Sequence, residues 1–256
     1  MRGSINAKDL DDAVASLRVL GGDLPNKALA DALNHTANQA NRALVDEIDE
    51  VFDHPTSFTR NAIRVFHAKP NNLEASLWVK DEKDGASKGA APEDWVAPQV
   101  FGGPRVDKAS ERNLRSKGIL PAGKFLVPGA GAKLDSYGNM SRGQIIQILS
   151  GLGAMEYRSG FKANATDSAR SIRKGHQRAY FVMKRGNVPI GIGERREGNV
   201  TMVLAFVSQP QYRVRFKFHD VVRGIAEDDS RLEANIEQAL AKACLLYTSD
   251  AADERA

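Results

Sequence analysis

The sequence predicts an α+β fold in which helices near both ends of the chain accompany a mostly antiparallel sheet. Apolar residues recur with helical spacing near both ends, whereas later short runs alternate apolar and polar residues between glycine-containing turns. Strand-like runs do not alternate regularly with helical ones, which argues against a doubly wound parallel sheet.

The N-terminal part is expected to contain helices followed by two strands. A first helix is predicted over residues 6–20, and a long one extends from about Pro25 to Phe52. Strands are predicted over residues 62–68 and 73–80, where the alternation has a period of two. The apolar stripe of the long helix is rich in alanine, so a neighbouring element can approach it closely: Leu29, Leu33, Ala37, Ala40, Leu44, Ile48 and Val51.

The middle of the chain is less regular. Residues 84–105 are rich in glycine, alanine and proline and lack periodicity, which predicts a long loop. Trp95 and Phe101 within this segment indicate that it covers a surface, because aromatic side chains bury large apolar areas. A short charged helix (106–117), an irregular stretch (121–140) and a helix (141–152) are expected to follow.

The C-terminal part predicts a meander and a final helix. Gly191-Ile192-Gly193 resembles the beginning of a dinucleotide-binding motif, but the third glycine and the following helix are missing. We interpret it as strand backbone that another backbone approaches closely. The expected elements are strands over 178–184, 188–195 and 200–208, an extended segment over 212–218, and a helix over 229–243.

Composition excludes several classes of protein. The 256 residues are 42% hydrophobic and 27% charged, an ordinary globular balance. No apolar run reaches the roughly 18 residues of a membrane span, and the first residues lack the apolar stretch of a signal peptide. We therefore expect a protein made in the cytoplasm of its producer, without membrane contact.

The C-terminal segment has an unusual sequence. Residues 244–254, CLLYTSDAADE, resemble the translation of a sequencing adapter. We therefore expect residues 1–243 to form a single α+β protein and residues 244–256 to be a non-native tail. The single cysteine, Cys244, falls in that tail, so neither a disulfide nor a cysteine-based metal site is expected.

No catalytic constellation is visible in the sequence. The five histidines include no pair with i, i+4 spacing, and neither a G-x-S-x-G motif nor a phosphate-binding loop occurs. We predict no catalytic, cofactor-binding or metal-binding residues, and hence no enzyme.

Four groups of residues, taken in order, resemble the minor tail protein Z family of long-tailed bacteriophages. The resemblance covers about residues 25–243. The groups are the alanine-rich helix followed by His54-Pro55-Thr56-Ser57-Phe58-Thr59; Phe101-Gly102-Gly103-Pro104-Arg105 with Glu111 and Leu114; Leu126-Val127-Pro128-Gly129, Asp135-Ser136-Tyr137-Gly138-Asn139-Met140 and Ile148-Leu149-Ser150; and Tyr180-Phe181-Val182, Gly191-Ile192 and Glu194-Arg195 leading to Tyr212-Arg213-Val214-Arg215-Phe216-Lys217-Phe218.

The resemblance implies a structural component of the virion, assembled in the bacterial host cytoplasm. Such proteins finish the head-proximal end of the tail so that it can join the filled head. Their partners are other tail and neck proteins, and they act as homo-oligomers; a ring needs head-to-tail interfaces that close. The 84–105 loop is then a candidate arm that orders against a neighbour. The residues we predict as assembly contacts are Trp95, Phe101, Arg105, Arg213 and Arg215.

Two alternatives remain open at this stage. The net charge of +4 and the basic residues of the C-terminal half would suit a DNA-binding protein whose non-specific affinity weakens steeply with salt. A hydrolase would need a convergent polar pocket. The basic residues concerned are Arg170, Arg173, Lys174, Arg178, Arg195, Arg196, Arg213 and Arg215.

Overall fold

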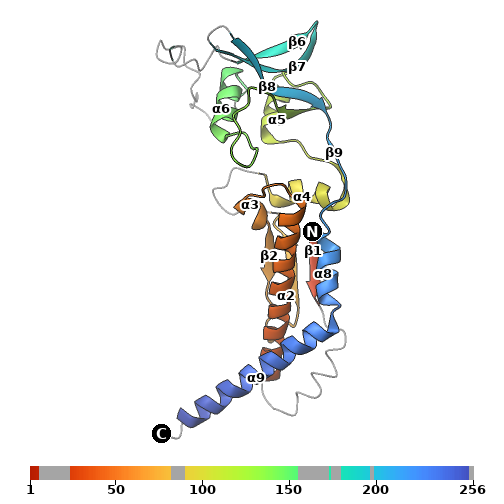
Figure 1. Cartoon of the computed structure of the whole chain (residues 1–256), viewed down its shortest axis with the longest axis vertical. Coiled ribbons are helices and arrows are strands. Elements are labelled where there is room, and N and C mark those ends of the chain that lie inside the picture. The colour runs from red at the N-terminus through yellow and green to blue at the C-terminus, as the bar shows by residue number, and fades with distance from the viewer. Residues whose placement is uncertain (6–23, 82–89, 155–172, 174–179, 197–198, 254–256) are drawn as a thin grey trace. The chain divides into compact units, whose positions relative to one another are not determined.

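The computed structural model describes residues 1–5, 24–81, 90–154, 173, 180–196 and 199–253, the last ten of them by backbone only (Figure 1). It confirms the α+β class, with a long N-terminal helix, antiparallel sheets and C-terminal helices that pack on the long helix. The chain forms two compact units. Unit 1 comprises Met1–Gly102 and Val214–Ala256, and unit 2 comprises Gly103–Arg213.

Unit 1 is built around helix α2 (Leu24–Val51). The predicted apolar stripe is confirmed, because its six members from Leu29 to Ile48 are at most 1% exposed. Helix α9 (Asp229–Asp253) packs along α2, where the buried Asn235 donates to Thr36 Oγ1 at 2.8 Å. A buried amide that finds its partner in only one alignment fixes how two helices are aligned.

A three-stranded antiparallel sheet lies beside α2 in unit 1. Its order is β1-β3-β2, with β1 (Arg2–Ile5), β2 (Ile63–Phe66) and β3 (Ala75–Val79). Strands β2 and β3 confirm the two predicted strands. Strand β1 was not predicted, because its sequence RGSI contains a single apolar residue and no alternation. Helix α8 (Phe218–Ala226) packs against β1, and the predicted helix over 6–20 lies outside the described residues.

The predicted loop over 84–105 is wrong for its described C-terminal part. Residues Pro92–Phe101 form helix α4, which buries Val96 and Val100 in the core of unit 1. Pro92 occupies the first turn, where a missing N–H costs nothing, and Glu93 and Asp94 favour the positive end of the helix. The composition suggested a loop because Pro98 lies inside this helix, where proline is normally unfavourable.

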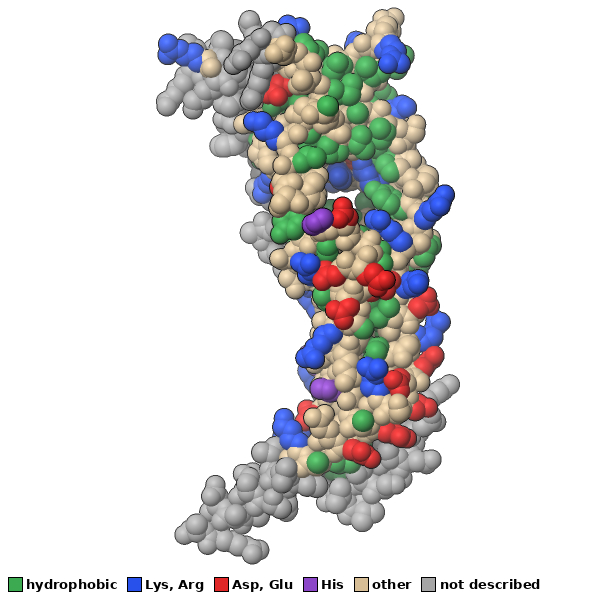
Figure 2. Space-filling view, in the orientation of Figure 1, with side chains coloured by type: hydrophobic (Ala, Val, Ile, Leu, Met, Phe, Trp, Pro, Cys, Tyr) green, Lys and Arg blue, Asp and Glu red, His purple; other side chains and the backbone are tan. Residues whose placement is uncertain are grey.

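The C-terminal end of α2 carries an acidic cluster (Asp46, Glu47, Asp49 and Glu50) that is unfavourable to the helix dipole. Figure 2 shows acidic side chains gathered over this part of the helix. Two of the four have partners in unit 1: Asp49 accepts from Arg60 Nε at 2.7 Å, and Glu47 accepts from the Lys217 N–H at 3.4 Å. Arg60 ends the short helix α3 (Ser57–Arg60), so the cluster helps to position the segments that follow α2 and precede α8.

The chain reverses after α2 through a left-handed residue. His54 has φ +48°, and among the described residues it is the one non-glycine position with positive φ. We expect His54→Gly to raise the free energy of unfolding by about 1 kcal/mol, because glycine adopts this conformation without steric cost. Urea unfolding checks this. His54→Ala is the control, since it keeps the strain while losing the contact between His54 Nδ1 and Asp53 Oδ1; equal stability of the two variants would contradict the prediction.

Unit 2 contains a four-stranded antiparallel sheet with the order β5-β8-β7-β6. The three predicted C-terminal strands are confirmed as β6, β7 and β8. The prediction that residues 121–140 are irregular is wrong for strand β5. This five-residue strand lies at the edge of the sheet between turn residues, and it is held by a long-range pairing with β8 that local sequence patterns do not reveal. The remaining bounds are β4 (Gly103–Pro104), α5 (Ala109–Ser116), β5 (Lys124–Pro128), α6 (Arg142–Gly151), β6 (Tyr180–Arg185), β7 (Val188–Arg196), β8 (Asn199–Ser208) and β9 (Gln211–Tyr212).

The predicted extended segment over 212–218 is only partly a strand. Strand β9 ends at Tyr212 and pairs with β4, and Phe218 already begins α8. Between them, the N–H groups of Arg215 and Phe216 donate to the backbone carbonyl of Gln99 in α4 instead of to a ladder. The alternation of residues 212–218 could not show where the strand ends. Phe216 and Phe218 are buried in the observed structure, as they would be on one face of a continuous strand.

The two glycines of β7 confirm a close backbone approach. A Cβ on Gly191 would lie 2.5 Å from the carbonyl oxygen of Leu204, whereas one on Gly193 would meet the movable ends of Phe181 and Met183 at 2.9 and 3.0 Å. We expect Gly191→Ala to lower the free energy of unfolding by about 2 kcal/mol and Gly193→Ala to lower it by less. Thermal and urea unfolding of the pair check this order; equal losses would show that the backbone contact is not what matters.

Candidate assembly surfaces

Seven rings form a continuous series of contacts in unit 1. Neighbouring ring centroids lie between 5.2 and 6.5 Å apart, within the range of favourable aromatic pairs. The members come from the segment directly after α2, from α3, α4 and α8, and from the segment before α8. We call them the aromatic series; in order of contact they are Phe58, Trp95, Phe52, Phe216, Phe218, His219 and Phe101.

The aromatic series is buried in the middle and exposed at its ends. Phe216 and Phe218 are at most 1% exposed, whereas Phe58 is 51% and Phe101 is 64% exposed. The buried rings belong to the hydrophobic core and hold their neighbours in place. The exposed ends are therefore apolar side chains on a well-packed support, which suits a contact with another protein.

Two predicted contact residues meet at one ring of this series. The Arg215 guanidinium lies 5.1 Å from the Phe52 ring centroid, and Trp95 contacts the same ring edge-on at 6.5 Å. Arg215 Nε also donates to Gln99 Oε1 at 2.7 Å. The fold thus brings together Trp95 and Arg215, which are far apart in the sequence, and fixes the arginine by a cation–π contact and a hydrogen bond.

Arg105, by contrast, lies inside unit 2. Its side chain is 11% exposed and pairs with the fully buried Glu111, with Nη1 donating to Oε2 at 2.7 Å. Glu111 also accepts from the backbone N–H groups of Lys108 and Leu126, each at 2.7 Å. The guanidinium of Arg105 lies 4.8 Å from the Phe125 ring centroid. This network ties α5 to the edge strand β5. The prediction of Arg105 as an assembly contact is therefore corrected, because its side chain is largely enclosed within unit 2.

The surroundings of Glu111 act on its pKa in opposite directions. Burial alone would raise the pKa of this carboxyl, but the hydrogen bonds from Arg105 and from the backbone of Leu126 and Lys108 together lower it. The same contact raises the pKa of the Arg105 guanidinium. Both groups therefore stay charged in the folded protein over the physiological pH range.

The remaining basic residues differ in their surroundings. Arg213, the fifth predicted contact residue, is exposed directly after β9. Arg195 lies over the Phe181 ring of its own unit at 5.4 Å. Arg170, Lys174 and Arg178 lie outside the described residues.

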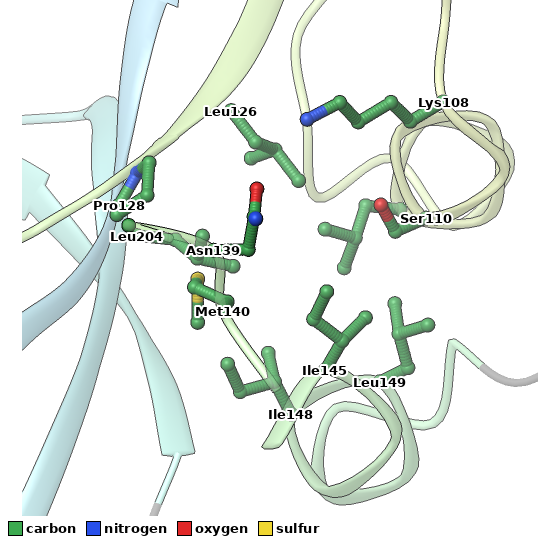
Figure 3. A pocket seen from close by; sticks show the side chains of 12 residues that line it. Lys108, Ser110, Leu126, Pro128, Asn139, Met140, Ile145, Ile148, Leu149 and Leu204 are labelled. Carbon is green, nitrogen blue, oxygen red and sulfur yellow. The ribbon is translucent and has the colours of Figure 1, made fainter. Parts of the chain in front are cut away.

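Unit 2 contains an apolar pocket between α5, α6, β5 and β8 (Figure 3). Its volume is about 270 Å³. Figure 3 shows Ile145, Ile148 and Leu149 of α6 on one side, and Lys108 and Asn139 extending their polar ends toward the cavity. We call this cavity the unit 2 pocket; its other lining residues are Ser110, Leu114, Leu126, Pro128, Gly138, Met140 and Leu204.

Among the described residues, no three His, Cys, Asp or Glu side chains are grouped so that they could hold a metal ion. In the same part of the chain, no helix combines the length and the hydropathy required to cross a membrane. Comparisons with protein-family models, with curated proteins and with solved structures gave no match.

Five members of the aromatic series and the unit 2 pocket were not predicted from the sequence. The five are Phe52, Phe58, Phe216, Phe218 and His219, although three of them, Phe58, Phe216 and Phe218, stand in segments that carry the family resemblance. The sequence contains no local pattern that would reveal the pocket, because its walls come from four elements that are distant in sequence. The apolar spacing of 145–152 indicated only that α6 has a buried face.

Proposed function

We propose that this chain is a structural component of a tailed-phage virion, a minor tail or tail-completion protein. In this role it acts at the head-proximal end of the tail during assembly and head–tail joining. The resemblance to the minor tail protein Z family supports the proposal, because its four groups of residues occur in order over about residues 25–243. The expected partners are other tail and neck proteins and further copies of the same chain.

The observation that carries the proposal is the aromatic series of unit 1. Exposed aromatic side chains on a fixed support are typical of the anchors of protein–protein interfaces. Phe58 and Phe101 have this character at the two ends of the series, and Trp95 and Arg215 lie along it. Trp, Tyr and Arg are the residue types that most often dominate binding energy.

A closed ring requires each copy to present two different surfaces. The chain offers two candidates: the exposed aromatic ends of the series in unit 1 and the unit 2 pocket with Lys108 in its lining. This combination supports contacts of the head-to-tail kind over an isologous dimer that uses one surface twice.

The proposal is tested in the phage that carries the gene. Particles made with the gene deleted are examined by electron microscopy, and purified wild-type particles are analysed by mass spectrometry. We expect the protein in the particles, and we expect free heads and unjoined tails in its absence. Infectious particles formed without the gene, or particles that lack the protein, would contradict the proposal.

A further inference from the structure

We propose that the unit 2 pocket binds a segment of a partner polypeptide that inserts a bulky apolar side chain into the cavity and places a carboxylate beside Lys108. The inference deepens the proposed function and rests on it for the partner being a protein. The proposal states which side chains the unit 2 pocket would bind. The family resemblance implies no role for this pocket.

The walls of the unit 2 pocket select an apolar group. Most of the lining side chains are aliphatic, and Leu114 and Ile148 are fully buried behind the surface. The volume of about 270 Å³ lies at the lower limit of the roughly 300–1,000 Å³ of pockets that hold cofactors or drug-sized ligands. A single large side chain suits this space better than a cofactor, and burying it gives favourable hydrophobic free energy.

Lys108 supplies a charge at the pocket that calls for an anion. Lys108 is exposed at the beginning of α5, and its pKa is lowered by partial desolvation and by the nearby Arg105, while Glu111 acts in the opposite direction. Glu111 is already paired with Arg105, and among the ion pairs of the described residues none involves Lys108. A partner carboxylate would therefore gain a charge-assisted hydrogen bond at the edge of the pocket that Lys108 lines.

The rim of the unit 2 pocket extends the apolar surface beyond the cavity. Leu134 and Tyr137 are 51% and 48% exposed on the loop that supplies Gly138, Asn139 and Met140 to the lining. The loop is held by Asp135, whose Oδ1 accepts from the N–H groups of Tyr137 and Asn139 at 2.9 Å. A preformed rim of this kind can hold the backbone on either side of an inserted side chain without a large ordering cost.

The test is a selection of peptides on the purified full chain from a random 12-residue library. We expect the selected peptides to combine Leu, Ile, Met or Phe with an Asp or Glu one or two positions away. Replacing that acidic residue by Asn or Gln should weaken binding about tenfold, the value of one charge-assisted hydrogen bond. Lys108→Gln should remove this difference, and Ile145→Trp, which fills the pocket, should abolish binding.

Two matched variants separate the pocket from its surroundings. Lys117→Gln removes a lysine at the other end of α5, and Ile146→Phe enlarges a half-buried residue of α6 that does not line the pocket. Both should bind as the wild type does, and the melting temperature of each variant confirms its folding. Failure to select any peptide, selection without acidic residues, or binding of octanoate in place of peptides would overturn the inference. None of these results bears on whether the protein is found in particles, so the proposed function is judged separately.

Discussion

Replacing Glu111 by glutamine is expected to lower the free energy of unfolding by about 3–5 kcal/mol. The substitution leaves the Arg105 guanidinium, 11% exposed, without the negative charge that compensates it. It also replaces the acceptor of the Lys108 and Leu126 N–H groups with an amide that has a single carbonyl oxygen. Breaking a buried pair from one side is costly because the remaining charge stays desolvated. Urea unfolding of the full chain, followed in the far-UV, measures the loss.

Two further variants define the cause of that loss. Asp107→Asn removes a carboxylate that pairs with Arg115 at 3.0 Å, but both of these side chains are more than a quarter exposed. We expect it to cost less than about 1 kcal/mol, as is typical of accessible ion pairs. The double variant Arg105→Met, Glu111→Leu should recover part of the stability, because it removes both buried charges. A double variant as unstable as Glu111→Gln would show that the charges are not the cause.

The lowered pKa of Glu111 also makes the free energy of unfolding depend on pH. In the unfolded chain this carboxyl titrates near its ordinary pKa of about 4.3, and in the folded protein below that value. The pair therefore contributes its full stability above the unfolded pKa and loses it as the pH falls through the folded one. The free energy of unfolding should fall less between pH 6 and pH 3 in the Arg105→Met, Glu111→Leu variant than in the wild type.

The parts of the fold that could be predicted are those determined by short-range periodicity. The stripe of α2 repeats with helical spacing over six turns, and the β7–β8 strands alternate between turn residues, so both were found. Helix α4 escaped prediction because its stability comes from burying Val96 and Val100 against unit 1, which outweighs the unfavourable Pro98. Such tertiary packing leaves no periodic trace in ten residues.

The candidate contact residues show the same limit. Trp95 and Phe101 were proposed from residue type, because aromatic side chains in a predicted loop need a surface to contact, and Arg215 was proposed from the basic residues of the extended segment over 212–218. Their role as contacts stays a prediction. The internal position of Arg105 depends on Glu111 and on strand β5 being adjacent, and strand β5 was not predicted. Because α4 belongs to the core of unit 1, deleting the segment that carries Trp95 and Phe101 would remove part of that core, so contacts there are tested by point substitutions at exposed positions.

Replacing Phe58 and Phe101 together by serine is expected to abolish head–tail joining while leaving the protein folded. Each ring is more than half exposed, so its loss removes little of the buried core. An aromatic anchor of an interface contributes about 2 kcal/mol or more, so the loss of both corresponds to roughly a thousandfold weaker association. The variant is supplied from a plasmid to phage that lack the gene, and infectious particles are counted.

The matched control for this double variant is Val188→Ser, which removes an equally exposed apolar side chain, 62% accessible, from the first residue of β7 in unit 2. It should restore infectious particles as well as the wild type does, and the unfolding curves of all three proteins should coincide. If Phe58→Ser, Phe101→Ser supports normal joining, the aromatic series is not an assembly surface, because two exposed anchors cannot be removed from an interface without loss of affinity. If Val188→Ser fails equally, the contact extends to unit 2, and the single-anchor variants Phe58→Ser and Phe101→Ser then show whether the aromatic ends contribute at all.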